Sequence, residues 1–332
     1  MLMFSSLISK LAGFMPAIPT PFAKDGEIDA AAFEWLCDHQ IKHGAAALVV
    51  CGTTGEAPTL TPAEHRKLIR LAVGVSGGRI PIIAGAGSNA TAHGIELTRD
   101  AEAVGADAIL SVVPYYNKPT RSGIYWHFRA IGQSTALPII LYDVPTRTVS
   151  ALADETLCQL AEIRQFIGVK DASGDVTRPL RLRSLLGPEF RLFSGDDATA
   201  FAFIAQGGNG CISVTSNVAP GLCRAMYAAQ EQGQISQAQE LASAVTKLTA
   251  VLFRESNPAP VKYALSLMHI MLPRVRLPLV EPKSETKAEI DATLAQMYEK
   301  YSGYLVGKPL WLEKRATEAI KEASKPKLVV VS

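Results

Sequence analysis

The sequence has few cysteines, and no two of them are spaced as a metal-binding or redox pair. Its 332 residues include five cysteines, an odd number without a CxxC motif, and most of them lie inside apolar segments. Such a set does not fit a disulfide framework and is typical of buried thiols in a reducing compartment. The five are Cys37, Cys51, Cys158, Cys211 and Cys223. We therefore expect free thiols and a cytoplasmic location.

A strong charge of one sign and long apolar runs are also missing. Lysine and arginine number 33 against 31 acidic residues, for a formal net charge of +2, and the basic residues are scattered. Without a basic stripe or a polybasic run, we expect neither a nucleic-acid partner nor binding to an anionic membrane. No uncharged run approaches the length of a membrane span. The apolar segment 1–22 contains Lys10 but no charged start and no clear cleavage site, so we expect no signal peptide.

No group of residues has the spacing of a metal site. His39 and His43 are four residues apart on a predicted helix, but a third ligand does not accompany them. We interpret them as a solvated or packing pair. The sequence predicts no metal and no organic cofactor.

One pattern recurs eight times: a short apolar run, a turn containing Gly or Pro, and then a helical segment. Apolar strands that alternate with helices indicate a parallel sheet covered by those helices. Eight such units fit an α/β (β/α)8 TIM barrel better than an open doubly wound sheet. The expected strands are residues 14–22, 46–52, 79–87, 106–114, 137–145, 166–174, 190–197 and 208–217.

The predicted helices divide the chain into three parts. In the helix expected over 61–76, Thr61 is the N-cap, Pro62 the first helical residue and Glu64 the capping-box partner. After the last strand only helical patterns follow. We expect a barrel domain over 1–218, a C-terminal helical region over 219–302, and an extension of unknown role over 303–332, with a further helix at 311–325.

The polar residues that could take part in catalysis or binding lie at the strand ends. Active sites of such barrels are built where strands end and the following loops begin. The segments at these positions are GTTGE (52–56), PYYNKP (114–119), YDVPTRT (142–148), Lys170, SGDD (194–197) and ISVTSN (212–217). Together they place hydroxyls, phenols, an arginine and one lysine around a common mouth.

Lys170 ends an apolar strand, which allows two interpretations. It could be an ordinary lysine that reaches solvent or pairs with Asp171 or Asp175. Alternatively, desolvation leaves some neutral amine, which can attack a carbonyl and form a Schiff base. Tyr142, at the end of the neighbouring strand, could be a half-buried amphipathic side chain. It could also move protons for Lys170, together with the hydroxyls of other strand-end residues: Thr53, Thr54, Tyr115 and Tyr116.

GTTGE and Arg147 also have a plain and a functional interpretation. GTTGE could be only a tight turn before a helix, or its backbone N–H groups could hold a carboxylate or phosphate. It lacks the lysine of a Walker sequence. Arg147 could form a surface ion pair, or its guanidinium could bind a substrate carboxylate.

The segments GTTGE, PYYNKP, YDVPTRT, GVKDASG, SGDDAT, GCISVTSNVAP and ESNPAPVKYAL occur in one order and spacing over roughly residues 11–300. In this the sequence resembles the dihydrodipicolinate synthase family, of the N-acetylneuraminate lyase superfamily of class I Schiff-base aldolases. The resemblance implies condensation of pyruvate with L-aspartate 4-semialdehyde to 4-hydroxy-tetrahydrodipicolinate, in lysine and diaminopimelate synthesis.

The resemblance also implies roles for single residues. Lys170 would form the Schiff base with pyruvate, and Tyr142 would transfer protons. Thr53 would link Tyr142 to Tyr116, which in the family enters the site from a neighbouring subunit, so a homotetramer or a dimer is implied. Thr54 would bind the pyruvate carboxylate. The remaining implied positions are Arg147 for the aldehyde's carboxylate, and Gly195 and Ile212 for their backbone near the site.

In family members inhibited by lysine, the inhibitor binds at a subunit interface. The matching positions are Ala57, Pro58, Pro62, His65, Asn89, His93 and Tyr115. His93 stands where the family usually has a glutamate that holds the ligand's ammonium, so we expect weak inhibition or none. A second departure is Asp143, where the family usually has Asn, and a carboxylate there could alter pKa values near the site.

Three other functions are open to this sequence. A sister aldolase, such as N-acetylneuraminate lyase or a 2-keto-3-deoxy sugar acid aldolase, would share the lysine and tyrosine, but Tyr115, Tyr116, Asn117 and Arg147 favour the synthase. A non-catalytic binding barrel would not need the full set of strand-end residues. A phosphate-binding barrel isomerase would need a catalytic Glu/His pair, which the strand ends lack.

Overall fold

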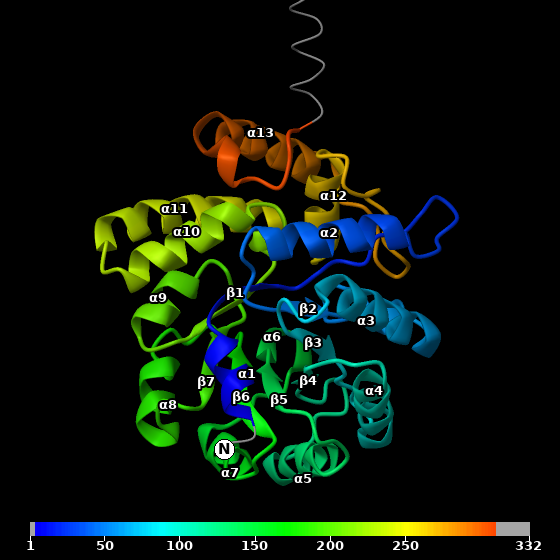
Figure 1. The fold of residues 1–332 in the computed structure, drawn as a ribbon, viewed down its shortest axis with the longest axis vertical. Coiled ribbons are helices and arrows are strands. Elements are labelled where there is room, and N and C mark those ends of the chain that lie inside the picture. Colours follow the sequence, from blue (N-terminus) through cyan, green and yellow to red (C-terminus); the bar gives the residue numbers. More distant parts are fainter. Residues whose placement is uncertain (1–3, 310–332) are drawn as a thin grey trace, which may run out of the picture.

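Eight parallel strands form one sheet in the computed structural model, which describes residues 4–309. Figure 1 shows the strands at the centre of the molecule with helices around them. Neighbouring strands in the sheet follow the order β1-β8-β7-β6-β5-β4-β3-β2. The strands are β1 (Gly13–Pro16), β2 (Leu48–Val50), β3 (Ile82–Gly85), β4 (Ala108–Val112), β5 (Ile139–Asp143), β6 (Phe166–Asp171), β7 (Arg191–Ser194) and β8 (Gly210–Ser213). The predicted (β/α)8 barrel is confirmed.

The barrel has two seams that involve its first strand. On one side β1 pairs with β8, with Gly13 opposite Gly210. A side chain at Gly210 would place its Cβ 2.0 Å from the Gly13 carbonyl oxygen, so this seam requires glycine. On the other side a parallel bridge joins Ala17 to Val49, and the Ile18 N–H donates to the Val49 carbonyl at 2.9 Å. These contacts close the sheet into a barrel.

Helices follow the strands and cover the outside of the barrel. They are α2 (Ala30–Lys42), α3 (Pro62–Ser76), α4 (Thr91–Ala103), α5 (Arg121–Gly132), α6 (Pro145–Thr148), α7 (Asp154–Ala161), α8 (Arg178–Leu186), α9 (Ala200–Ala205) and α10 (Pro220–Glu231). The capping box of α3 is confirmed: the Thr61 side chain accepts from the Glu64 N–H, and the Glu64 carboxylate accepts from the Thr61 N–H. This reciprocal pairing satisfies backbone donors at the helix start.

Alternation along the strands separates two apolar cores. Successive strand residues point to opposite faces, so one set fills the barrel and the other packs beneath the helices. On β5, Ile140 and Tyr142 belong to the cluster inside the barrel, whereas Ile139 and Leu141 belong to the cluster under the helices. This pattern decides which residues at the end of β5 face the mouth of the barrel.

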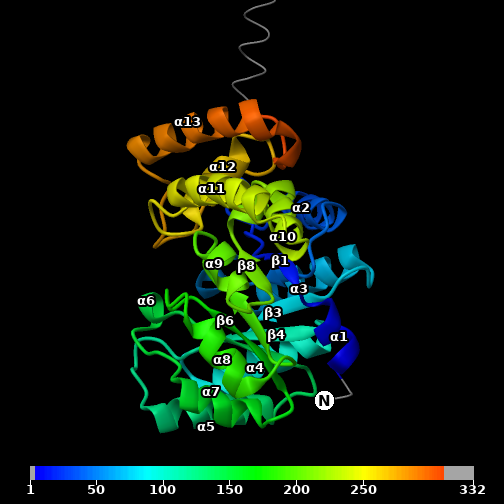
Figure 2. The ribbon, with the colours of Figure 1, turned by 90° about the vertical axis from the view of Figure 1, so that its left-hand side faces the viewer.

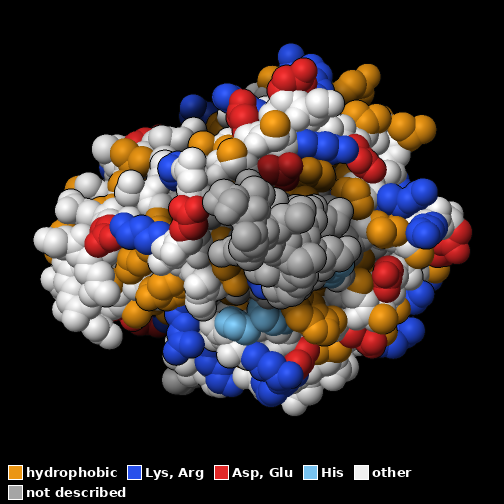
Figure 3. Space-filling view, turned by 90° about the horizontal axis from the view of Figure 1, so that it is seen from above, with side chains coloured by type: hydrophobic (Ala, Val, Ile, Leu, Met, Phe, Trp, Pro, Cys, Tyr) orange, Lys and Arg blue, Asp and Glu red, His pale blue; other side chains and the backbone are white. Residues whose placement is uncertain are grey.

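Three helices extend the molecule at one end. They are α11 (Ile235–Leu252), α12 (Ala259–Ser266) and α13 (Ser284–Tyr301), which lie together with α2 and α10 at the top of Figure 1 and in the turned view of Figure 2. Figure 3 looks onto this end and shows acidic and basic side chains interspersed. The helix expected at 311–325 lies outside the described residues, and the domain limits at 218 and 302 remain predictions.

The N-terminal segment forms a helix that sequence reasoning did not predict. In α1 (Ser5–Lys10), Ile8 is buried and packs with Leu11 and Met15 in the cluster inside the barrel. None of the helices within residues 4–309 is both long and apolar enough to cross a membrane. All five cysteines are free thiols, as expected, and only Cys158 is partly exposed.

Candidate active site

Lys170 and Tyr142 lie side by side at the ends of two neighbouring strands. In the register of β5 and β6, Tyr142 is directly opposite Lys170. Only 7% of Lys170 and 8% of Tyr142 is exposed. The Lys170 Nζ lies 4.2 Å from the centroid of the Tyr142 ring. The strand ends thus bring a buried amine against a phenol, as the sequence predicted.

Neither aspartate proposed as an alternative partner of Lys170 pairs with it. Asp171 is 3.4 Å from Arg178, and Asp175 is 2.9 Å from Arg181. The salt-bridge interpretation of Lys170 is therefore wrong for these two carboxylates. The Lys170 amine instead lies against the Tyr142 ring, in a position from which it can attack a carbonyl carbon.

Gly195 gives the Lys170 side chain the space that it occupies. A Cβ added at Gly195 would lie 3.1 Å from the Lys170 Cε and 2.9 Å from the Ala172 Cβ. The absence of a side chain at the end of β7 thus lets Lys170 extend into the mouth. Ile212, on β8, is buried in the cluster inside the barrel. The structure places both residues at the same end of the sheet as Lys170, as predicted.

The GTTGE loop is held in place by residues far along the chain. Thr54 is buried, and its Oγ1 accepts a hydrogen bond of 2.9 Å from the Asn257 Nδ2. The Gly55 carbonyl accepts from the Thr20 hydroxyl at 2.7 Å. Thr53 is only partly buried. These contacts give the loop a fixed position beside the barrel mouth.

Glu56, the last residue of this loop, forms an ion pair inside the protein. It has a left-handed backbone conformation, with φ of 57°, and its Oε1 lies 2.6 Å from the Nζ of Lys262. Both side chains are fully buried. Burial lowers the pKa of Lys262 to about 8, and the nearby Glu56 carboxylate opposes that shift. The Arg276 N–H donates to the other Glu56 oxygen at 3.0 Å.

Sequence reasoning missed Asn257 and Lys262 as supports of the site. Both lie in the segment ESNPAPVKYAL, which the resemblance included without giving its residues a role. Their partners are about 200 positions earlier in the chain, and no local pattern indicates such pairs. A polar residue in an otherwise apolar helix, as Lys262 is in α12, is the one signal that could have drawn attention to it.

Three predicted residues are less enclosed in the single chain. Tyr116 is 88% exposed and has a positive φ of 72°, and Tyr115 beside it is also exposed. Arg147 is exposed on the short helix α6, directly after β5. Within residues 4–309, no hydrogen bond joins the hydroxyls of Thr53, Tyr116 and Tyr142. The predicted proton relay is therefore not assembled within one chain.

The candidate lysine-binding residues are not equally accessible. His65 is buried, and its Nε2 lies 2.7 Å from the Gly85 carbonyl oxygen, while burial lowers the pKa of its imidazole. His93 is exposed, and its Nδ1 lies 3.3 Å from Glu96. The carbonyl of Asn89 accepts a 2.8 Å hydrogen bond from Asn117. Ala57 is partly buried at the start of the 3-10 helix η2 (Ala57–Thr59).

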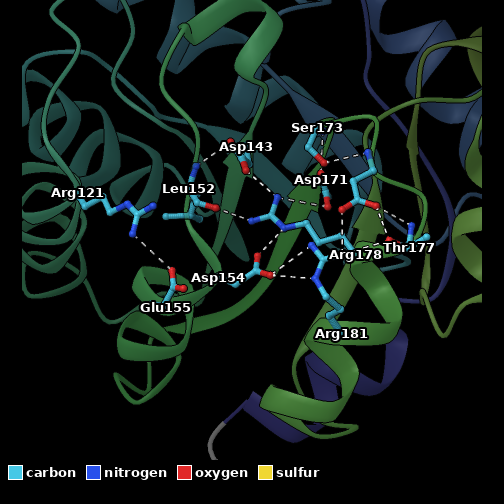
Figure 4. Close-up of polar contacts among 11 residues, drawn as sticks. Arg121, Asp143, Leu152, Asp154, Glu155, Asp171, Ser173, Thr177, Arg178 and Arg181 are labelled. Carbon is cyan, nitrogen blue, oxygen red and sulfur yellow. Dashed lines mark hydrogen bonds and ion pairs between the residues drawn. The ribbon is translucent and has the colours of Figure 1, made fainter.

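Asp143 faces away from the barrel mouth. It follows Tyr142 on β5, so its side chain points outward, where it is fully buried. Its Oδ2 accepts a hydrogen bond of 2.7 Å from the Arg178 Nη1, and its Oδ1 accepts from the Leu152 N–H at 3.1 Å. Burial raises the pKa of Asp143, and Arg178 opposes the rise. The expected carboxylate near the substrates is thus part of an ion cluster behind them (Figure 4).

No group of three or more His, Cys, Asp or Glu side chains in the described part of the chain is arranged to hold a metal ion. The rings of His39 and His43 stack at 3.9 Å, and Trp35 stacks on His39 at 4.7 Å. This is a packing arrangement, as predicted.

Comparison with known proteins bears on the chemistry of this site. The model of the Dihydrodipicolinate synthetase family matches residues 10–297. The 4-hydroxy-tetrahydrodipicolinate synthase of Hyphomonas neptunium is 49% identical over 285 residues, covering 85% of this chain and 97% of its own.

Two solved structures share the fold. The chloride-inhibited dihydrodipicolinate synthase of Acinetobacter baumannii, complexed with pyruvate, has a TM-score of 0.84 at 42% identity, covering 86% of this chain and 98% of its own. The enzyme of Cyanidioschyzon merolae with lysine bound has a TM-score of 0.84 at 36% identity, covering 86% and 98%. With its lysine and tyrosine on adjoining strand ends of a closed barrel, and a family match over most of its length, this chain belongs to the dihydrodipicolinate synthase family.

Proposed function

We propose that the protein is a lyase that condenses pyruvate with L-aspartate 4-semialdehyde to give 4-hydroxy-tetrahydrodipicolinate, in lysine and diaminopimelate synthesis. The observation that carries this proposal is the buried Lys170 amine, 4.2 Å from the Tyr142 ring centroid, in a chain 49% identical to a relative of that name. The free thiols support a cytoplasmic enzyme.

The reaction begins at the Lys170 amine. Its neutral form attacks the keto carbon of pyruvate, and the carbinolamine loses water to give an imine. The Tyr142 hydroxyl carries protons between the amine, the departing oxygen and solvent. Loss of a methyl proton converts the imine to an enamine, whose carbon attacks the aldehyde. The amine of the new chain then displaces Lys170 by transimination and closes the ring. The imine is the electron sink, so the step uses no organic cofactor or metal.

The substrate carboxylates are held on two sides of the mouth. The pyruvate carboxylate binds Thr54 and the backbone of the GTTGE loop, a role supported by the fixed position of that loop. The backbone at Gly195 and Ile212 borders the same space. The carboxylate of the aldehyde, which is the second substrate to enter, binds Arg147. Arg147 is exposed at the rim, where an entering substrate can reach its guanidinium.

The complete site includes a second subunit. Tyr116 reaches the mouth of a neighbouring subunit, where Thr53 links it to Tyr142. Its exposure of 88% in the single chain supports this role, because a large aromatic side chain is seldom left uncovered. The protein is accordingly a homotetramer built as a dimer of dimers, or a dimer.

We expect Arg147→Ala to damage the use of the aldehyde and leave the reaction with pyruvate intact. Loss of a charge-assisted contact of about 1.5–3 kcal/mol lowers kcat/KM for aspartate semialdehyde roughly tenfold to a hundredfold or more. The measurement is a steady-state assay coupled to removal of the product, with borohydride labelling of Lys170 by pyruvate alongside.

Two comparisons make this assay a test of the function. The unchanged protein must prefer aspartate semialdehyde over N-acetylmannosamine and over aldehyde products of sugar-acid cleavage, since a preference for either would identify a sister aldolase. Arg121→Ala is the control, because Arg121 is an exposed arginine whose one ion pair in the described part of the chain is with Glu155, at 3.8 Å. Equal loss of pyruvate labelling and aldehyde use in Arg147→Ala would contradict the role given to Arg147.

L-Lysine is expected to inhibit weakly, with half-inhibition above about 1 mM. An imidazole at position 93 replaces a carboxylate that would hold the ligand's ammonium, and losing such a bond weakens binding roughly tenfold to a hundredfold. His93→Glu should therefore restore tighter inhibition, measured by titrating lysine in the coupled assay. His93→Gln, which removes the imidazole without adding a carboxylate, is the control. Sub-millimolar inhibition of the unchanged enzyme would refute this expectation.

A further inference from the structure

The ends of β5 and β6 each carry two consecutive residues that face opposite sides of the sheet. Tyr142 lies opposite Lys170, and Asp143, the next residue, lies opposite Asp171. Because strand residues alternate, the first pair faces the mouth and the second pair faces the surrounding helices. Any contact that joins the two aspartates from behind therefore fixes the spacing of the tyrosine and the lysine in front.

Arg178 makes that contact. It is the first residue of α8, and Figure 4 shows its guanidinium between the two aspartates. Its Nη1 lies 2.7 Å from the Asp143 Oδ2 and 3.4 Å from the Asp171 Oδ2. All three side chains are nearly inaccessible, with 5% of Arg178, 1% of Asp143 and 2% of Asp171 exposed.

Arg178 and Asp171 each make further hydrogen bonds around this cluster. The Arg178 Nη2 donates to the Leu152 carbonyl, and the Nε donates to Asp154 at 2.8 Å. Asp171 accepts the Ser173 N–H at 2.8 Å through its Oδ1. Its Oδ2 makes no hydrogen bond within residues 4–309, and the 3.4 Å ion pair with Arg178 is the contact that faces it. A planar guanidinium offers its donors in fixed directions, so it holds several acceptors in one geometry, which a lysine ammonium cannot reproduce.

We propose that Arg178 is a positioning residue that holds the ends of β5 and β6 together through Asp143 and Asp171, and so sets the Tyr142 phenol against the Lys170 amine. The inference rests on the proposed function, because it assumes that the phenol moves protons for the amine. It does not require Arg178 to touch a substrate. A displacement of about 1 Å in such a pair can cost a hundredfold in rate.

The test is a double-mutant cycle between Arg178→Lys and Tyr142→Phe. The measured quantity is the rate of imine formation with pyruvate, obtained by quenching with borohydride at successive times and quantifying modified Lys170 by mass spectrometry. Arg178→Lys alone should slow imine formation roughly tenfold to a hundredfold. In the Tyr142→Phe background, where no phenol remains to be positioned, the same substitution should slow it less than about threefold.

Each other outcome overturns the proposal in an identifiable way. An equal loss in both backgrounds means that Arg178 acts only on overall stability. If Arg178→Lys does not slow imine formation when Tyr142 is present, the ion cluster does not set the position of the Tyr142 phenol against the Lys170 amine. If Tyr142→Phe itself leaves imine formation unchanged, the proton-transfer role in the proposed function fails first, and the positioning role fails with it.

Two further variants control for folding. Arg181→Lys changes the neighbouring arginine on α8, which pairs with Asp154 and Asp175 but with neither strand-end aspartate, and should leave the rate unchanged. If Arg178→Lys does not fold, Asp171→Asn replaces it in the cycle. That variant keeps the shape of the side chain and the contacts of Arg178 to Asp143 and Asp154, and it weakens only the tie to β6.

Discussion

Lys170→Ala should lower kcat by about 10⁴-fold or more, the largest loss expected of any single substitution in this protein. Removing a residue that forms the covalent intermediate eliminates the route itself, and losses of this order or greater are typical of nucleophile removal. The thermal midpoint should change little, because within residues 4–309 Lys170 has no carboxylate partner to leave uncompensated. The measurement combines steady-state kinetics with pyruvate and borohydride treatment, digestion and mass spectrometry of the peptide that holds residues 166–175.

The protein contains its own control for this experiment. Lys262 is even more buried than Lys170, with 0% against 7% exposed, and is paired with Glu56 at 2.6 Å. Its peptide should stay unmodified in the digest that shows the pyruvate adduct on Lys170. Two outcomes would contradict Schiff-base formation at Lys170. One is an adduct on Lys262, and the other is an unmodified 166–175 peptide under conditions that label a known Schiff-base aldolase.

Lys262→Met should destabilise the protein by about 3–5 kcal/mol. The substitution leaves the Glu56 carboxylate fully buried and without its ion-pair partner, and the cost of that uncompensated charge exceeds what the apolar side chain contributes. Urea unfolding at one fixed protein concentration measures the change, since subunit association would otherwise shift the midpoint.

Two variants separate the burial of a charge from the loss of an ion pair. Lys287→Met breaks the exposed pair with Glu281, at 2.7 Å, and should cost no more than about 1 kcal/mol. The double variant Lys262→Met with Glu56→Gln should recover much of the lost stability, because no buried charge remains. A Lys262→Met variant as stable as the unchanged protein would show that Glu56 finds another partner or takes up a proton.

The fold and the central pair of the site could be predicted because both depend on local patterns. Apolar runs alternating with helices indicate the barrel, and a lysine and a tyrosine that end adjacent runs meet at one mouth. Strand lengths were less well predicted: residues 14–22 were expected as a strand, but β1 is Gly13–Pro16. Pro19 and Pro21 lack the N–H groups that a sheet requires, so the apolar run continues beyond the ladder.

The supports of the site could not be read from the sequence because they join distant segments. Asp143 was expected near the substrates, yet strand alternation turns it outward to Arg178, 35 positions later. The Asn257 contact to Thr54 spans 203 positions. Such pairs depend on how helices pack on the finished barrel, and one sequence contains no pattern that encodes that packing.

The seam between β1 and β8 has a consequence for how the chain is made. Gly13 leaves the ribosome long before Gly210, its partner in the register, has been synthesised. During that interval one edge of β1 has no partner, while its other edge contacts the segment of β2 through the Ala17–Val49 bridge and the hydrogen bond from the Ala46 N–H to the Phe14 carbonyl. Pairings between such distant segments form late and leave sheet edges open to other chains. The nascent chain is therefore most prone to aggregation until β8 has been translated, and chaperones should bind it mainly in that period.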